Sequence, residues 1–93
     1  MGLEIDGVSG IIKNTTSDGD VTIKGNDGGS EISALILDMS DAGTATFNHD
    51  VKLGDNSKAL FGAGSDLQIY DDGSHSYVQD TGTGHLRLGG DNG

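Results

Sequence analysis

The chain of 93 residues contains no cysteine, no proline and no tryptophan. Without cysteine it has no disulfide and no Cys-based zinc site, and its redox compartment stays open because oxidising and reducing compartments both accommodate cysteine-free proteins. The absence of proline is compatible with a structure made of strands, since proline removes a hydrogen-bond donor from a β-ladder.

Large apolar residues are also scarce. Leu, Ile, Val and Phe together supply 21 of the 93 residues, close to the level of about 20% below which an acidic chain is usually disordered. Small domains compensate for a thin core with disulfides, a metal or oligomerisation. Because disulfides are excluded, oligomerisation is the remedy that the composition favours.

Acidic residues outnumber basic residues by 15 to 5, and the formal net charge is −10. Such a charge opposes binding to nucleic acid and to anionic membrane surfaces. Apolar runs such as 34–37 are too short for a transmembrane span or for the apolar part of a secretion signal. We therefore predict no nucleic-acid partner and no membrane insertion.

The pattern of apolar residues predicts strands. The chain has 17 glycines, each of which costs about 1 kcal/mol in a helix interior, and no window places apolar residues at helical spacing. Alternation with a period of two residues is frequent instead, which predicts short strands with one apolar face. The alternating segments are 21–23, 44–47, 51–53, 67–69 and 86–88.

Clusters of Gly, Asp, Asn and Ser separate these segments and predict turns. The clusters lie at 14–20, 25–30, 38–43, 54–58, 62–66, 71–76 and 80–84. We expect about nine or ten short strands between them, the pattern of an all-β protein. Sandwiches and barrels need more aromatic bulk than two Phe and two Tyr provide. A solenoid or an intertwined β-helix of several chains is therefore favoured.

The end of the chain is an imperfect second copy of its beginning. The aligned positions are 11–12 with 77–78, Thr15 with Thr81, Val21 with Leu86, Ile23 with Leu88, and Gly25 with Gly90. Repetition of a small strand-turn-strand unit indicates an elongated β structure. We predict a single repetitive segment over 1–93, cut from a longer chain, with repeat-like units at about 7–28, 34–53 and 73–93.

Three stretches of the sequence carry a resemblance to a known family. They are SALILDMSDAGTATFNHDV (33–51), GDNSKALFGAGSDLQIY (54–70) and DGSHSYVQDTGTG (72–84). Together they resemble segments of bacteriophage tail-fibre and related virion appendage proteins, especially those of marine phages, over about residues 31–90. Relatives commonly carry a histidine after the Ile-Tyr pair, where this chain has Asp71, so no histidine-based site is predicted at that turn.

The resemblance implies a homotrimeric fibre in which three chains wrap about a common axis. We therefore expect an all-β, elongated, intertwined trimeric β-helix or β-prism. Its function would be that of a structural shaft segment of a phage tail fibre, joined to other fibre segments and supporting attachment to a host receptor. The resemblance places such a segment in the virion, outside the cell when it functions.

Apolar residues of the expected strands are predicted to face the trimer axis or the core between chains. They are Ile12, Val21, Ile23, Ile36, Phe47, Val51, Leu53, Leu67, Ile69, Val78, Leu86 and Leu88.

Two alternatives stay open. In the first, the chain is a receptor-binding module that contacts a host-surface glycan through Tyr70, Asp72, His75 and Tyr77, because an exposed aromatic beside polar groups is the usual composition of a carbohydrate-binding patch. In the second, the chain is part of a monomeric β-solenoid adhesin that needs cations to fold.

No catalytic residue and no cofactor are predicted. The two specific calcium patterns fail: after 62–66 the apolar residue comes one position too early for a β-roll, and an EF-hand frame over 20–31 has Thr22 and Lys24 where oxygen ligands belong. The three histidines have no paired spacing, so no metal site is predicted within one chain. Adventitious binding of a divalent cation between the acidic turns of adjacent chains stays open, as does an ion bound by three inward histidines on a trimer axis.

Overall fold

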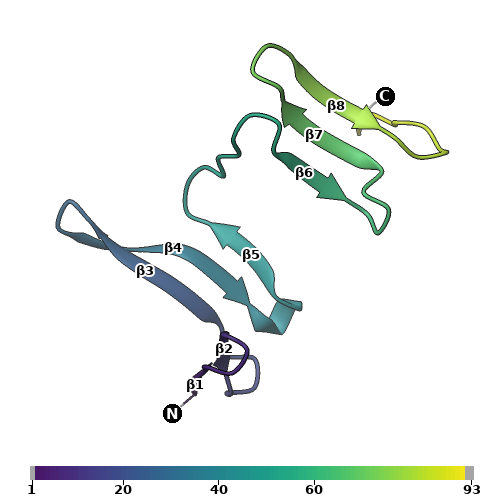
Figure 1. The fold of residues 1–93 in the computed structure, drawn as a ribbon. Helices are drawn as coiled ribbons and strands as arrows, with labels where there is room; N and C mark the ends of the chain where they lie inside the picture. Colours follow the sequence, from purple (N-terminus) through teal and green to yellow (C-terminus); the bar gives the residue numbers. More distant parts are fainter. Residues whose placement is uncertain (1, 92–93) are drawn as a thin grey trace. The chain divides into compact units, whose positions relative to one another are not determined.

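The computed structural model describes residues 2–91, and in this range the chain is built from short strands joined by turns and loops (Figure 1). The strands are β1 (Leu3–Asp6), β2 (Ile11–Asn14), β3 (Val21–Asp27), β4 (Ser30–Asp38), β5 (Thr44–Phe47), β6 (Lys58–Phe61), β7 (Leu67–Asp71) and β8 (Ser76–Asp80). A single 3-10 turn, η1 (Met39–Asp41), lies between β4 and β5. The predicted all-β class is confirmed.

The strands form three small antiparallel sheets. Strands β1 and β2 pair alone, β3-β4-β5 form a second sheet, and β6-β7-β8 form a third, and none of these sheets closes into a barrel. The described residues divide into two compact units, the first ending at Val51 and the second beginning at Lys52. The first unit holds two sheets and the second unit holds one.

The chain reverses direction within the predicted clusters of Gly, Asp, Asn and Ser. Between β3 and β4, Gly28 and Gly29 both have positive φ, 62° and 101°, as a two-residue type I′ hairpin requires. Between β4 and β5, the Asp38 carboxylate caps η1 by accepting a hydrogen bond from the Ser40 backbone N–H at 3.1 Å. Ala42 and Gly43 then adopt left-handed conformations that end the 3-10 turn.

Two of the predicted strands are absent from the described structure, and the strand that contains Ile36 is longer than expected. Residues 51–53 and 86–88 alternate but lie outside the strands, so the expectation of nine or ten strands was too high. Two alternating apolar residues form a strand only where a neighbouring strand pairs with them through backbone hydrogen bonds. The apolar run 34–37, which does not alternate, instead lies in β4, the nine-residue centre of its sheet.

Each sheet has one apolar face, because side chains alternate between faces along every strand. In the second sheet, one row across the three strands is Ile23, Leu35 and Phe47. The next row on the same face is Val21, Leu37 and Ala45. The row between them, on the opposite face, is Thr22, Ile36 and Thr46.

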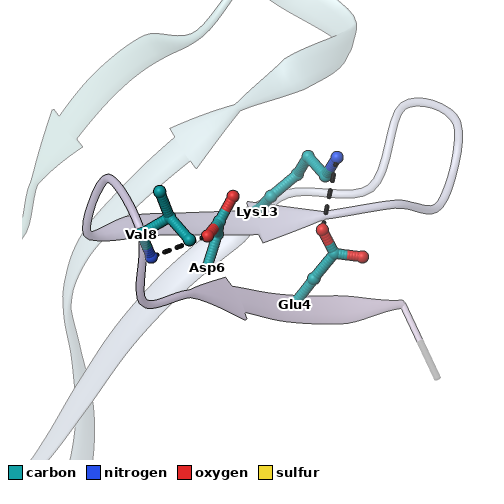
Figure 2. A network of polar contacts seen from close by, with 4 residues as sticks. All are labelled: Glu4, Asp6, Val8 and Lys13. Carbon is teal, nitrogen blue, oxygen red and sulfur yellow. Dashed lines mark hydrogen bonds and ion pairs between the residues drawn. The ribbon is translucent and has the colours of Figure 1, made fainter.

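The first and third sheets follow the same plan. In β1-β2, Ile5 lies opposite Ile12 on one face, while Glu4 lies opposite Lys13 on the other. The Lys13 ammonium is 3.4 Å from the Glu4 carboxylate (Figure 2). In the third sheet the apolar face is made by Ala59, Phe61, Leu67, Ile69 and Val78.

These apolar faces remain open to solvent in the single chain. Among the described residues no side chain is buried, and Ile5, Ile23 and Phe47 are 71%, 54% and 48% exposed. The chain exposes 7584 Å². A globular monomer of 9.5 kDa exposes about 5,000 Å², and even two separate globules of half that mass would expose about 6,000 Å² in total.

Candidate functional site

Most residues predicted to form the trimer core lie on the open apolar faces. Ile12 is on the first sheet, Val21, Ile23 and Phe47 are on the second, and Leu67, Ile69 and Val78 are on the third. The structure brings each group together on one face of one sheet.

The other predicted core residues lie elsewhere. Ile36 is on the opposite face of the second sheet, between Thr22 and Thr46. The segments 51–53 and 86–88, with Val51, Leu53, Leu86 and Leu88, are outside the strands. A core between chains is not visible in one chain, so all these assignments stay predictions.

Sequence reasoning missed several residues of the apolar faces. They are Leu3, Ile5, Leu35, Leu37, Ala59 and Phe61. Leu3, Leu35 and Leu67 are equally spaced along the chain, and each is the first paired residue of a hairpin. Ile5, Leu37 and Ile69 have the same spacing, so this signal could have found the missed residues of β1 and β4 but not those of β6.

The four residues predicted for receptor contact gather at the β7-β8 hairpin. Tyr70 and Tyr77 are directly opposed in the ladder, and their rings stack with 4.7 Å between centroids and 17° between planes. The Lys58 ammonium lies 4.6 Å from the centroid of the Tyr70 ring. A cation over an aromatic face is attracted by the ring quadrupole.

The hairpin loop is organised by the carboxylate of Asp72. One oxygen, Oδ1, accepts hydrogen bonds from the backbone N–H groups of Ser74 at 2.9 Å and His75 at 2.7 Å. The other, Oδ2, accepts from the Tyr77 hydroxyl at 3.1 Å. Asp72 is thus the residue that connects the loop backbone to the stacked tyrosines.

These hydrogen bonds change the proton affinity of both groups. The N–H groups of His75 and Ser74, followed by the hydroxyl of Tyr77, lower the pKa of Asp72 below its ordinary 3.8, because they stabilise the ionised carboxylate. The same contact with the Asp72 carboxylate raises the pKa of Tyr77 above 10.0, since the phenol must keep its proton to donate.

A second turn supports this loop. The Asn56 backbone N–H donates to the Asp71 carbonyl at 2.7 Å, and the Asp71 carboxylate accepts from the Gly73 N–H at 2.9 Å. Gly73 has φ of 95°, and a Cβ there would lie 3.2 Å from an Asp55 carboxylate oxygen. The loop therefore requires glycine at this position.

The arrangement offers an aromatic surface beside hydrogen-bonding groups, but the hydroxyls of both tyrosines are already engaged within the chain. The Tyr70 hydroxyl donates to the Gln79 side chain at 3.3 Å, and Tyr77 donates to Asp72. The His75 ring lies 6.4 Å from the Tyr77 ring and is tilted by 39°. The contacts of the Tyr70, Asp72 and Tyr77 side chains hold the hairpin together, whereas His75 takes part through its backbone N–H.

A cavity of about 370 Å³ lies beside the far end of the same hairpin. Asp66, Asp80, His85 and Arg87 contribute polar side chains to its wall. Within residues 2–91, no three His, Cys, Asp or Glu side chains are grouped so that they could hold a metal ion. The cavity thus offers mixed charges and no metal-binding set.

Comparison with protein-family models gives no match, and neither curated proteins nor solved structures yield a relative of this chain. In the part of the chain that the structure describes, no helix has the length and apolar character needed to cross a membrane.

Proposed function

We propose that this chain is a structural shaft segment of a homotrimeric phage tail fibre, in which three copies cover one another's apolar sheet faces. The segment would act mechanically, spacing or carrying the parts of the particle that attach to the host, and it would be located in the virion. The fold expected for this role is an intertwined trimeric β-helix or β-prism.

The observation that carries this proposal is the open apolar face on each of the three sheets. Side chains such as Phe47, Ile69 and Val78 are 48%, 42% and 57% exposed, although burial of a large apolar side chain is worth about 1.5–3 kcal/mol. Monomeric soluble proteins rarely leave contiguous apolar patches open, and larger patches mark interaction sites. Neighbouring copies would supply the missing burial.

The composition of the chain and its resemblance to phage tail fibres also support the proposal. A chain with few large apolar residues and a net charge of −10 needs partners to build a core. The number three comes from the resemblance of residues 31–90 to phage tail-fibre segments.

The mass of the native particle tests the proposal. A trimer of the 9.5 kDa chain is expected in light scattering or native mass spectrometry, and its circular dichroism should show β structure that is lost together with the trimer on dilution or heating. A folded monomer would overturn the proposal and favour the monomeric, cation-dependent solenoid.

A second candidate function is recognition of a host-surface glycan at the β7-β8 hairpin, where Tyr77 remains 36% exposed. Aromatic rings beside a carboxylate suit the apolar faces and hydroxyls of a sugar. In glycan-array binding, Tyr70→Ala and Tyr77→Ala should abolish any signal of the wild-type chain, whereas Val8→Ala, in the β1-β2 turn, should leave it unchanged. Absence of wild-type binding would contradict this second function without affecting the first.

A further inference from the structure

The sequence contains Asp-Gly pairs in four different turns, beginning at Asp6, Asp18, Asp27 and Asp72. In this dipeptide the backbone nitrogen of glycine can attack the carboxyl carbon of the aspartate side chain, because glycine has no side chain to shield its nitrogen. The attack requires a carboxyl group that is free to turn and a nitrogen that is free to move. The four pairs have the same chemistry, so their local structure decides which of them reacts.

The pairs at Asp6 and Asp18 are each held by a hydrogen bond. The Asp6 carboxylate accepts from the Val8 backbone N–H at 2.9 Å, which fixes the side chain (Figure 2). Gly19 donates its N–H to the Thr16 carbonyl at 2.9 Å, which fixes the nitrogen that follows Asp18. Each pair therefore has one of its two reacting groups restrained.

The pair Asp72-Gly73 has both reacting groups restrained. The Asp72 carboxylate accepts from the N–H groups of Ser74 and His75, and the Gly73 N–H donates to the Asp71 carboxylate at 2.9 Å. The bonds from His75 and Ser74 also lower the pKa of Asp72, because they stabilise its ionised form. The attack consumes the neutral carboxyl group, since the departing oxygen leaves as water, so this pair is doubly protected.

The pair Asp27-Gly28 has neither restraint. Asp27 is exposed, and within residues 2–91 its side chain makes no hydrogen bond or ion pair, while the neighbouring Asn26 side chain accepts from the Gly29 N–H at 2.7 Å. The Gly28 N–H likewise donates to no group in this range. Asp27 is paired with Ser30 at the very end of the β3-β4 ladder. Opening of this one terminal pair frees both reacting groups, and such ends open at a low free energy.

We propose that Asp27-Gly28 is a site of spontaneous isoaspartate formation. The Gly28 nitrogen forms a bond to the side-chain carboxyl carbon of Asp27, one carboxyl oxygen leaves as water, and a succinimide ring closes. Water then opens the ring. Cleavage between the nitrogen and the side-chain carbon restores aspartate, whereas cleavage between the nitrogen and the backbone carbon gives isoaspartate. One water is lost and one is gained, so the mass is unchanged and no other reactant is needed.

Isoaspartate would loosen the end of the β3-β4 hairpin. It adds one methylene to the main chain, so the type I′ turn no longer joins the two strands in the observed register, and the pairing of Asp27 with Ser30 is lost. A shift of register between Ile23 and Lys24 separates this end from the apolar rows of the sheet. The apolar face therefore stays intact, and the modification does not depend on the proposed trimer.

Incubation of the native chain in H₂¹⁸O at mildly acidic pH tests the proposal, because each opening of the ring places one solvent oxygen on the residue. Trypsin, used afterwards in ordinary water, cleaves after Lys and Arg and separates the four pairs into the peptides 1–13, 14–24, 25–52 and 59–87. We expect label in 25–52, located at Asp27 by fragmentation, to grow several-fold faster than label at the other three pairs.

Two controls isolate the effect of structure. In urea the four pairs should take up label at similar rates, because the unfolded chain holds none of them. Asp27→Glu should remove the label from this position in the native chain, since glutamate would have to close a larger ring.

Equal rates in the native chain, or faster labelling at Asp18 or Asp72, would overturn the proposal. So would label at Asp27 that appears only in urea, because the end of the hairpin would then not open in the folded chain. The native mass is measured separately, so none of these outcomes affects the proposed shaft function.

Discussion

The ring of Tyr70 stacks on the ring of Tyr77 across the β7-β8 ladder, with 4.7 Å between their centroids. The outer end of each ring has its own acceptor, Gln79 for Tyr70 and Asp72 for Tyr77. The pair therefore closes the hairpin on the face opposite to Ile69 and Val78. One face of this sheet stays open while the other is fixed within the chain.

The contact between Asp72 and Tyr77 predicts that the hairpin is least stable at the two extremes of pH. The pKa of Asp72 is lowered by folding, so its contribution to stability is present above 3.8 and lost as the pH falls below that value. The pKa of Tyr77 is raised, so its contribution is present below 10.0 and lost as the pH rises through the elevated folded value. Melting temperatures followed by circular dichroism across this range measure both effects.

Tyr77→Phe is the matched variant because it keeps the ring and removes the hydroxyl. It should lose the alkaline decline assigned to this contact and retain most of the acid decline, since the N–H bonds from Ser74 and His75 remain. Asp72→Asn should make both the alkaline decline and the acid decline of the melting temperature smaller. An alkaline decline that is unchanged in Tyr77→Phe would contradict the assignment.

Two glycines, one in the β3-β4 turn and one in strand β3, should respond in opposite ways to substitution by alanine. Gly29 has φ of 101°, and a Cβ added there would meet no other atom, so Gly29→Ala should destabilise the chain by about 1–2 kcal/mol through backbone strain alone. Gly25 lies within β3, with open space and no positive φ. Gly25→Ala should be neutral or stabilise by about 0.4–1 kcal/mol, because it restricts the unfolded chain.

Urea unfolding of the two variants beside the wild type measures this difference at a fixed protein concentration. If both substitutions shift the midpoint equally, the type I′ geometry of Gly28 and Gly29 is not what specifies the hairpin.

The turns could be predicted from the sequence because their cause is local. Gly supplies positive φ at 28–29 and at Gly73, and Asp38 and Asp72 form hydrogen bonds to the backbone a few residues ahead. The strands could be predicted only where a segment of alternating apolar residues also has a neighbouring strand to pair with. Residues 86–88 alternate like 21–23, but a strand also requires a partner edge, and no local pattern contains that information.

The candidate site was predictable in its membership and not in its geometry. The sequence places Tyr70 and Tyr77 on either side of a turn, which predicts proximity. Whether their rings stack on each other or point toward a ligand depends on the cross-strand register, which follows from the length of the loop. The placement of Ile36 was not predictable for a related reason: in the continuous apolar run 34–37, alternation alone does not say which residues share a face.

Because the apolar face of the second sheet is open, we predict that Phe47→Ser destabilises the assembly of copies more than it destabilises the fold of the single chain. Phe47 is about half exposed in one chain, so covering the rest of the side chain contributes on the order of 1 kcal/mol per copy. We expect the mutant to dissociate at a higher protein concentration in sedimentation equilibrium. Val8→Ser, in a turn and 94% exposed, should leave the mass unchanged. Equal effects of the two changes would count against the face as an interface.

The net charge predicts a salt dependence. Each copy carries −10, and assembly brings these charges together, where they repel one another over a screening distance of about 8 Å at physiological salt. The melting temperature should therefore rise between low and moderate ionic strength. A melting temperature that stays flat or falls in sodium chloride would contradict close packing of acidic chains.

The native mass of the wild-type chain in solution tests the central claim most directly. Light scattering at moderate salt should give a particle of three times 9.5 kDa. A folded particle of one chain mass, with its β structure intact, would contradict the account.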